Sequence, residues 1–508
     1  MTHMDIISFL VEKGADIFKA NYNGGTCLIN SIQSVELCTY LLKHGVDVNA
    51  TDVQNKSALH YAIQEHRLET TELLLKYNAD PYLRSAQNDD ALQTACLKGA
   101  IEIFEYLVDK LPYSPERLAD AYELLGSTCF EDHNDTQKAL EYWRTALTIR
   151  SENGVDGVPI PKKPVLPKRD TYRNATEFTT LRELNAIAVD VDAIRIQSLL
   201  ICERILGPHH KDTLFRLMFR GASYADAVRY QPCIDLWRRA LEIRVAKYSI
   251  LYSDTCFTAQ ALLRLMVDLN EKTIEATDQN REKEEPRFCD VAAIFKLLSE
   301  PLTSGRKLLE YQPVHPLVPD SYNRIFKCVT HFIYLLVETA TSNDDKTLTK
   351  QLLRELVKQN PTSVDAEDTL LHLCVSSLNT ISSSSFSMAV GIPKIFPRLD
   401  VVKLLLECGA DVNARNLLRS TPLHIASEPR NFHSSLVKLL LDYGAHVDTP
   451  NIVGDIPVRL ICSNPLNNVK LVNYISLQCY AARAISKYGI GCTELPRTLY
   501  TFLELHKC

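Results

Sequence analysis

The sequence has little glycine, no long apolar run and no strong excess of charge, and each shortage excludes a class of protein. Glycine supplies 17 of 508 residues, which disfavours the glycine-rich loops that hold phosphates. No stretch approaches the roughly 20 apolar residues of a membrane span, and Asp5 and Glu12 interrupt the start where a signal peptide is apolar. The net charge is −6, so the chain has no excess of basic residues from which to form the basic face of a nucleic-acid-binding protein. We therefore expect no nucleic-acid or membrane partner, and a location in the cytoplasm with the nucleus as a second compartment.

Fifteen cysteines are spread along the whole chain. They are too sparse for a disulfide scaffold, which is short and rich in cysteine. No Cys-x-x-Cys occurs, and no group of cysteines and histidines has the spacing of zinc ligands. The sequence therefore predicts reduced, mostly buried thiols, with no metal and no cofactor.

Signatures of catalysis are also missing. The sequence contains no Walker loop, no Gly-x-Ser-x-Gly elbow, no kinase signature and no His-Glu-x-x-His motif. Carboxylate pairs such as Asp89 and Asp90 are common in a chain with 62 acidic residues, so a pair alone is weak evidence for an active site. We predict a protein without catalytic residues.

One pattern recurs at both ends of the chain with a period near 33 residues. Leu10–Ile17, Leu41–Val48 and Leu74–Pro81 resemble one another, and Leu404–Asn413 and Leu439–Val447 repeat the pattern near the C-terminus. A second element, Thr-x-Leu-His, recurs at a constant distance from this pattern. Period and residue types are typical of ankyrin repeats, in which Thr or Ser caps the first helix. A glycine in the left-handed conformation should end the second helix; the expected positions are Gly14, Gly45, Gly409 and Gly444.

Three histidines, His60, His372 and His424, occupy the same slot of the Thr-x-Leu-His element. An isolated histidine suggests a metal ligand or an acid–base group. Because these three follow the repeat so strictly, we predict instead that each hydrogen-bonds the turn of its own repeat.

The region between the two arrays contains two similar segments, Ala139–Arg150 and Cys233–Arg244. The only tryptophans, Trp143 and Trp237, occupy equivalent positions in them, each with an alanine three residues later. A large aromatic residue facing a small one is typical of tetratricopeptide-like helix pairs, so both tryptophans are expected in the core rather than on a ligand platform.

These patterns predict an all-α fold, a repeat solenoid in which ankyrin repeats flank a tetratricopeptide-like helical middle. The proline-rich stretch 151–170 is expected to be an exposed, partly extended connection. The predicted divisions are 1–111 for the first ankyrin array, 112–345 for the middle, 346–470 for the second array and 471–508 for the tail.

The tail contains two short motifs in order. Leu477 is followed by Ala481 and Ile485 along one helical face, with Ser476 as a cap. This spacing resembles an elongin-BC box, and Leu495, Pro496 and Leu499 resemble a cullin box of the type associated with cullin-2. The alternative for the first motif is a helix that only seals the last repeat. Both motifs together favour recruitment, and one helix can do both.

The whole arrangement resembles the feminization-1 (Fem) family of ubiquitin-ligase substrate receptors. The resemblance rests on segments in the middle region and on the tail motifs, and it runs essentially from residue 3 to residue 506. The segments are Ala121–Thr128, Ala139–Arg150, Arg204–His210, Arg220–Asp226, Leu477–Ala484 and Leu495–Leu499 with Phe502. Membership implies docking on elongin B/C and on cullin-2 with its RING protein, and capture of C-terminal degrons that typically end in arginine.

One departure concerns the N-terminus, where the chain enters the ankyrin array with what resembles the second helix of a repeat. We expect this incomplete repeat to expose an apolar edge. Members of the family usually begin with further repeats that supply acidic and aromatic groups for the degron, so the remaining groove offers fewer candidates. The candidate substrate-binding residues are Tyr22, Asn23, Asp52, Asn55, Asn88, Asp89 and Asp90.

Three hypotheses for function follow. The first is a ligase adaptor that brings a target to a ubiquitin-charged enzyme. The second is an ankyrin scaffold without a ubiquitination role, which has no need for both tail motifs. The third is an enzyme hidden in the middle region, which a convergent polar cluster in a deep pocket would support.

Overall fold

The computed structural model describes residues 3–154, 156–275, 285–311, 317–381, 394–475, 477–491, 495–496 and 499–505. Over these residues the chain is helical, without a strand, and two isolated bridges join Thr51 to Ser57 and Thr362 to Thr369. It forms two compact units, residues 1–220 and residues 221–508. No helix in the described parts is long and apolar enough to cross a bilayer. The predicted all-α repeat solenoid is confirmed.

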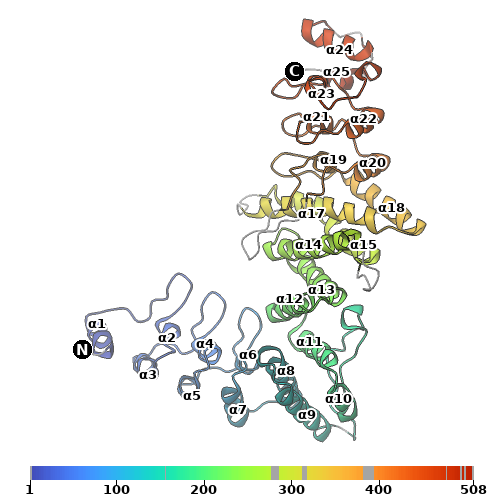
Figure 1. Cartoon of the computed structure of the whole chain (residues 1–508). Coiled ribbons are helices and arrows are strands. Elements are labelled where there is room, and N and C mark those ends of the chain that lie inside the picture. Colours follow the sequence, from blue (N-terminus) through green and yellow to red (C-terminus); the bar gives the residue numbers. More distant parts are fainter. Residues whose placement is uncertain are drawn as a thin grey trace. The chain divides into compact units, whose positions relative to one another are not determined.

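Unit 1 begins with short helices stacked in sequence order (Figure 1). Longer helices follow, and the last of them, α12, contains the division between the units. The helices are α1 (His3–Glu12), α2 (Cys27–Asn30), α3 (Val35–Lys43), α4 (Ala58–Gln64), α5 (Leu68–Lys76), α6 (Ala91–Lys98), α7 (Ile101–Lys110), α8 (Pro115–His133), α9 (Thr136–Glu152), α10 (Leu181–Ile187), α11 (Val191–Leu206) and α12 (Lys211–Asp226).

Unit 2 continues with long helices and then returns to short ankyrin pairs. Its core is one continuous apolar cluster that runs from Ile234 to Leu471. The helices are α13 (Tyr230–Tyr248), α14 (Ser253–Glu275), α15 (Phe288–Ser299), α16 (Leu302–Leu308), α17 (Leu317–Thr339), α18 (Asn343–Gln359), α19 (Leu370–Cys374), α20 (Leu399–Glu407), α21 (Pro422–Ser427), α22 (Ser434–Asp442), α23 (Pro457–Ser463), α24 (Leu477–Tyr488) and α25 (Tyr500–Leu505).

The turns of the ankyrin repeats behave as the sequence predicts. Gly14, Gly45, Gly409 and Gly444 have φ values of 93°, 82°, 95° and 90°, a region that residues with a Cβ rarely adopt. Apolar side chains on the first helix of the array, Ile6, Phe9 and Leu10, are about half exposed. The expected apolar edge is therefore present.

The three repeat histidines have the predicted structural role and a further one. In each, Nδ1 accepts from the backbone N–H of the cap residue, as in Thr421 N to His424 Nδ1 at 3.0 Å. Their Nε2 atoms reach carbonyls of the following repeat, those of Asp89, Ser420 and Asp455 at 3.0, 2.9 and 3.2 Å respectively. Each histidine therefore caps its own helix and also joins two repeats.

Both tryptophans pack in helix pairs, but the small residue that faces them is a glycine on the preceding helix. Trp143 is fully buried, and its Nε1 donates to the carbonyl of Glu123 at 3.0 Å. A Cβ added to Gly126 would lie 2.7 Å from that nitrogen, and one added to Gly221 would lie 2.4 Å from the partly buried Trp237. The alanines that suggested the pairing, Ala146 and Ala240, are buried elsewhere in the same helices.

The proline-rich connection is mostly exposed, and Lys162 is the clearest departure from that expectation. The side chain of Lys162 is only 8% exposed, and its Nζ lies 3.2 Å from Glu123 and 3.3 Å from Glu177. Glu123 also pairs with Arg150 and Arg204. Burial alone would raise the pKa of Glu123, but Lys162, Arg204 and Arg150 outweigh it and lower that pKa. A buried ion-pair cluster therefore fixes this connection to the helices of unit 1.

Candidate functional site

Helix α24 packs on the end of the second ankyrin array and has two different faces. Cys479 and Ala482 are buried, with 4% and 1% of their surface exposed. At 3.6 residues per turn, Leu477 and Ala481 lie on the opposite side of the helix, and both are exposed. The helix therefore seals the array with one face and leaves the other uncovered.

The centre of the uncovered face is apolar, and the exposed Gln478, Arg483 and Lys487 lie at its edges. Leu477 is 86% exposed, and Tyr480 and Tyr488 on the same side of the helix are 57% and 70% exposed. Ile485, the third residue of the predicted elongin motif, is half-buried at the border between the two faces. The two tyrosines were not among the predicted site residues, although both follow from the helical spacing of Leu477. Ser476, the predicted cap, lies outside the described residues.

Two polar contacts join α24 and the residues before it to the array. Tyr474, just before the helix, donates its hydroxyl to Asp442 Oδ1 of α22 at 2.7 Å. Within the helix, the Sγ of Cys479 lies 3.9 Å from His446 Nδ1, in the turn after α22. The orientation of the uncovered face is therefore set by the last repeat.

The second tail motif lies close to α24. Leu495 is half-buried, Pro496 is exposed, and Leu499 is 37% exposed with its N–H bonded to the carbonyl of Pro496 at 2.9 Å. Helix α25 follows, contacts α24, and buries Leu503. The structure therefore places both predicted motifs on the same end of unit 2.

The candidate substrate residues of unit 1 lie mostly at exposed turn tips. Tyr22, Asn23, Asn55 and Asn88 are exposed, and the two later asparagines have left-handed φ values of 55° and 73°. Asp52 is half-buried and accepts the hydroxyl of Tyr61 at 2.6 Å as well as two backbone N–H groups. Burial would raise the pKa of Asp52, but these hydrogen bonds outweigh it and lower the pKa.

Asp89 and Asp90 do not lie at the surface, which corrects the expectation that they offer charge to a peptide. Asp89 is buried with Oδ1 at 3.0 Å from His210 Nε2. Asp90 caps α6 by accepting from Gln93 N at 2.9 Å, and its Oδ2 lies 2.6 Å from Arg117 Nη2. Because each carboxylate already has a partner in this chain, both serve the packing of unit 1.

A cavity of about 470 Å³ lies in unit 2, beside α17 and the start of the second ankyrin array. Charged side chains of both signs line it, including Asp320 and Arg324, which pair at 2.8 Å, and Lys327. His372 also lies in its wall, but both ring nitrogens are hydrogen-bonded within the array. Burial lowers the pKa of His372, as expected of a structural histidine.

Stacked ankyrin helix pairs in both units, with an uncovered helix after the second array, define the class of ankyrin-repeat binding proteins. Ankyrin-repeat profiles match residues 2–85, 50–117 and 394–482, and a single-repeat profile matches residues 366–417. The recurring pattern of the sequence is therefore confirmed as ankyrin.

Relatives identify the family more closely. The chain is 30% identical over 539 aligned positions to protein fem-1 homolog A-like of Mus musculus, covering 97% of this chain and 79% of that protein. It is 30% identical over 537 positions to protein fem-1 homolog A of Bos taurus, with the same coverage. Protein fem-1 homolog C of Mus musculus is 31% identical over 425 positions, which cover 82% of this chain and 65% of that protein. The chain belongs to the fem-1 family, which confirms the resemblance drawn from the sequence.

Proposed function

We propose that this chain is a substrate receptor of a cullin-2 RING ubiquitin ligase. In this function α24 docks on elongin B/C, and the segment around Leu495, Pro496 and Leu499 contacts cullin-2. The uncovered apolar face of α24 supports the proposal best, because a helix that only sealed the array would have no reason to expose Leu477.

The two residue types on this face suit insertion into a groove. Leu477 projects a branched apolar side chain into solvent, and its burial would contribute roughly 1.5–3 kcal/mol. Ala481, one turn further on, leaves room for a partner backbone to approach closely. An apolar side chain followed by small or apolar residues at i+4 and i+8 is the usual pattern of helix-in-groove recognition.

The chain's part in ubiquitination is positional. A receptor that holds a target next to a ubiquitin-charged enzyme makes the transfer effectively intramolecular, which raises the effective concentration of the reacting groups. The target itself is bound by the repeat arrays, since the solenoid offers long surfaces that contact peptides.

For the substrate, the proposal is a protein C-terminus bound by the first ankyrin array. The exposed tips that carry Tyr22, Asn23, Asn55 and Asn88 provide an aromatic ring and amide groups for a peptide. A fluorescent peptide ending in arginine should bind the purified chain, while its C-terminally amidated form should bind more weakly. Tyr22→Ala should weaken the binding, and equal affinity for both peptides would refute recognition of a C-terminus.

Co-purification tests the ligase role directly. The full chain is expressed together with elongin B/C and cullin-2, beside the variant Leu477→Asp. We expect a stable complex that the variant loses while remaining folded, because the side chain contacts nothing that the chain itself needs. No complex from the folded parent chain would refute the proposal and leave the scaffold hypothesis.

A further inference from the structure

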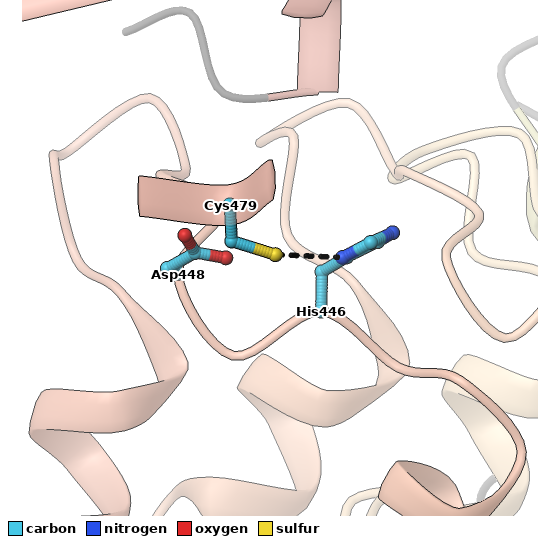
Figure 2. Close-up of side chains that lie close together, drawn as sticks. All are labelled: His446, Asp448 and Cys479. Carbon is cyan, nitrogen blue, oxygen red and sulfur yellow. Dashed lines mark hydrogen bonds between the residues drawn. The ribbon is translucent and has the colours of Figure 1, made fainter. Parts of the chain in front are cut away.

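Three potential metal ligands meet where α24 joins the last repeat. His446 and Asp448 come from the turn after α22, and Cys479 comes from α24. One ligand atom from each lies within 4.8 Å of the others. Figure 2 shows the Sγ of Cys479 between the Asp448 carboxylate and the His446 ring, whose Nδ1 faces the sulfur. We propose that this cluster binds one divalent transition-metal ion, with Zn²⁺ as the natural candidate.

The distances suit such an ion. Zinc binds sulfur at about 2.3 Å and nitrogen or oxygen at about 2.0–2.2 Å in a tetrahedron, which places the ligand atoms roughly 3.3–3.8 Å apart. The Sγ of Cys479 and His446 Nδ1 are 3.9 Å apart. All three ligand atoms lie within 4.8 Å of one another, so side-chain rotation has to close the remaining gap to bonding distance, and water would complete the fourth position.

Charge and ligand chemistry favour a transition metal over Ca²⁺ or Mg²⁺. Asp448 and Cys479 are buried, with 6% and 4% of their surface exposed. A carboxylate, a thiolate and a neutral imidazole around a divalent ion form a neutral assembly, which avoids leaving a charge in a buried place. Sulfur and imidazole nitrogen are ligands of zinc-like ions, while calcium and magnesium prefer oxygen alone. On binding, the Cys479 thiol loses its proton to solvent.

The repeat architecture explains why sequence spacing conceals this cluster. His446 and Cys479 are 33 residues apart, which equals one ankyrin period. Residues one period apart lie side by side in a solenoid, although they are too distant in sequence for a familiar zinc motif. The ion would fix α24 to the last repeat, and the edge-on contact between His446 and Phe502, with ring centroids 5.4 Å apart, would extend its effect to α25.

Cobalt is a suitable probe because a thiolate bound to Co²⁺ gives a charge-transfer absorption in the near ultraviolet. The untagged full-length chain is treated with a chelator, desalted and titrated with Co²⁺. We expect one equivalent to produce this absorption and one equivalent of Zn²⁺ to remove it. Cys479→Ser should abolish the absorption, and Asp448→Asn should weaken binding by at least about tenfold, because substitution of residues that only orient a metal ligand already costs about tenfold to 100-fold.

Cys462→Ser is the matched control, since Cys462 is an exposed thiol on α23 of the same unit. This variant should bind Co²⁺ as the parent does, and circular dichroism checks that all variants are folded. A parent chain that gives no charge-transfer absorption would overturn the proposal, and so would an absorption that persists in Cys479→Ser. The readout involves neither elongin nor cullin, so the site stands or falls independently of the ligase role.

Discussion

Helices α22 and α24 occupy neighbouring positions at the end of unit 2, but their outward faces differ. Both pack an apolar face inward, α22 with Leu436, Val437, Leu440 and Leu441. Outward, α22 presents Ser435, Lys438 and Asp442, as a solvated repeat helix does. The exposed side of α24 presents Leu477, Tyr480, Ala481 and Tyr488, with Gln478, Arg483 and Lys487 at its edges.

The difference separates what the fold requires from what it does not. The inward side chains of both helices are explained by burial against the array. An outward patch that includes Leu477 gains nothing for the isolated chain and costs solubility. A partner protein that covers the exposed face of α24 would explain the patch. This comparison of the two helices underlies the proposed docking of elongin.

The largest expected effect comes from a negative charge on the inward face of α22, compared with the same charge on the exposed face of α24. Leu440→Asp removes a fully buried leucine and buries a carboxylate, so it should cost about 4 kcal/mol or more of unfolding free energy. Leu477→Asp should change stability by less than about 0.5 kcal/mol. Urea denaturation of both variants measures this, and equal destabilisation would show that α24 has no free face.

The exposed tyrosines provide the second test. Tyr480→Ala should weaken binding to elongin B/C about 30-fold, or about 2 kcal/mol, because central aromatic residues dominate interface energies. Calorimetric titration of the purified chain with elongin B/C measures the change in affinity. Lys438→Ala on the outward face of α22 should have no effect, and a similar loss in that control would place the interface on the array rather than on α24.

The sequence predicts those parts of the fold that depend on local rules. The glycines that end repeat helices and the histidines that cap them act over three or four residues, and a 33-residue period identifies the repeat. The packing of Trp143 against Gly126 depends on which helix lies opposite, so the sequence pattern pointed to an alanine of the same helix instead.

The candidate site was predicted in part for a similar reason. Leu477 and Ala481 belong to a motif within one helix, and the structure exposes both. Asp89 and Asp90 resemble surface acids in sequence, but they are buried by partners 121 and 27 residues away, His210 and Arg117. Long-range pairing of this kind has no local signal, and the same holds for the burial of Lys162.

Lowering the pH should destabilise the repeat formed by α21 and α22 and leave the exposed face of α24 unchanged. Burial lowers the pKa of His424 to about 4, against about 6.5 in an unfolded chain. The unfolded chain therefore takes up the proton first, and the stabilisation present above pH 6.5 is lost as the pH falls towards 4. At pH 5 the loss from this residue should be about 2 kcal/mol.

The variant His424→Gln isolates this contribution, because Gln93 fills the same slot in the first array and does not titrate. Unfolding free energies at pH 7 and pH 5 should differ by about 2 kcal/mol less in the variant than in the parent. An unchanged difference would mean that other groups, such as the buried His331, cause the acid sensitivity.

The smallest expected effect concerns the turn that leads out of α22. Asn413 accepts from His446 N at 2.9 Å and donates to the carbonyl of Gly444 at 3.0 Å. Asn413→Ala removes both hydrogen bonds at a half-buried position, so it should cost about 1 kcal/mol of unfolding free energy. Asn413→Asp keeps the acceptor and should cost less. Denaturation of the two variants measures the order, and because this turn carries His446, the alanine variant should also bind Co²⁺ more weakly than the aspartate variant.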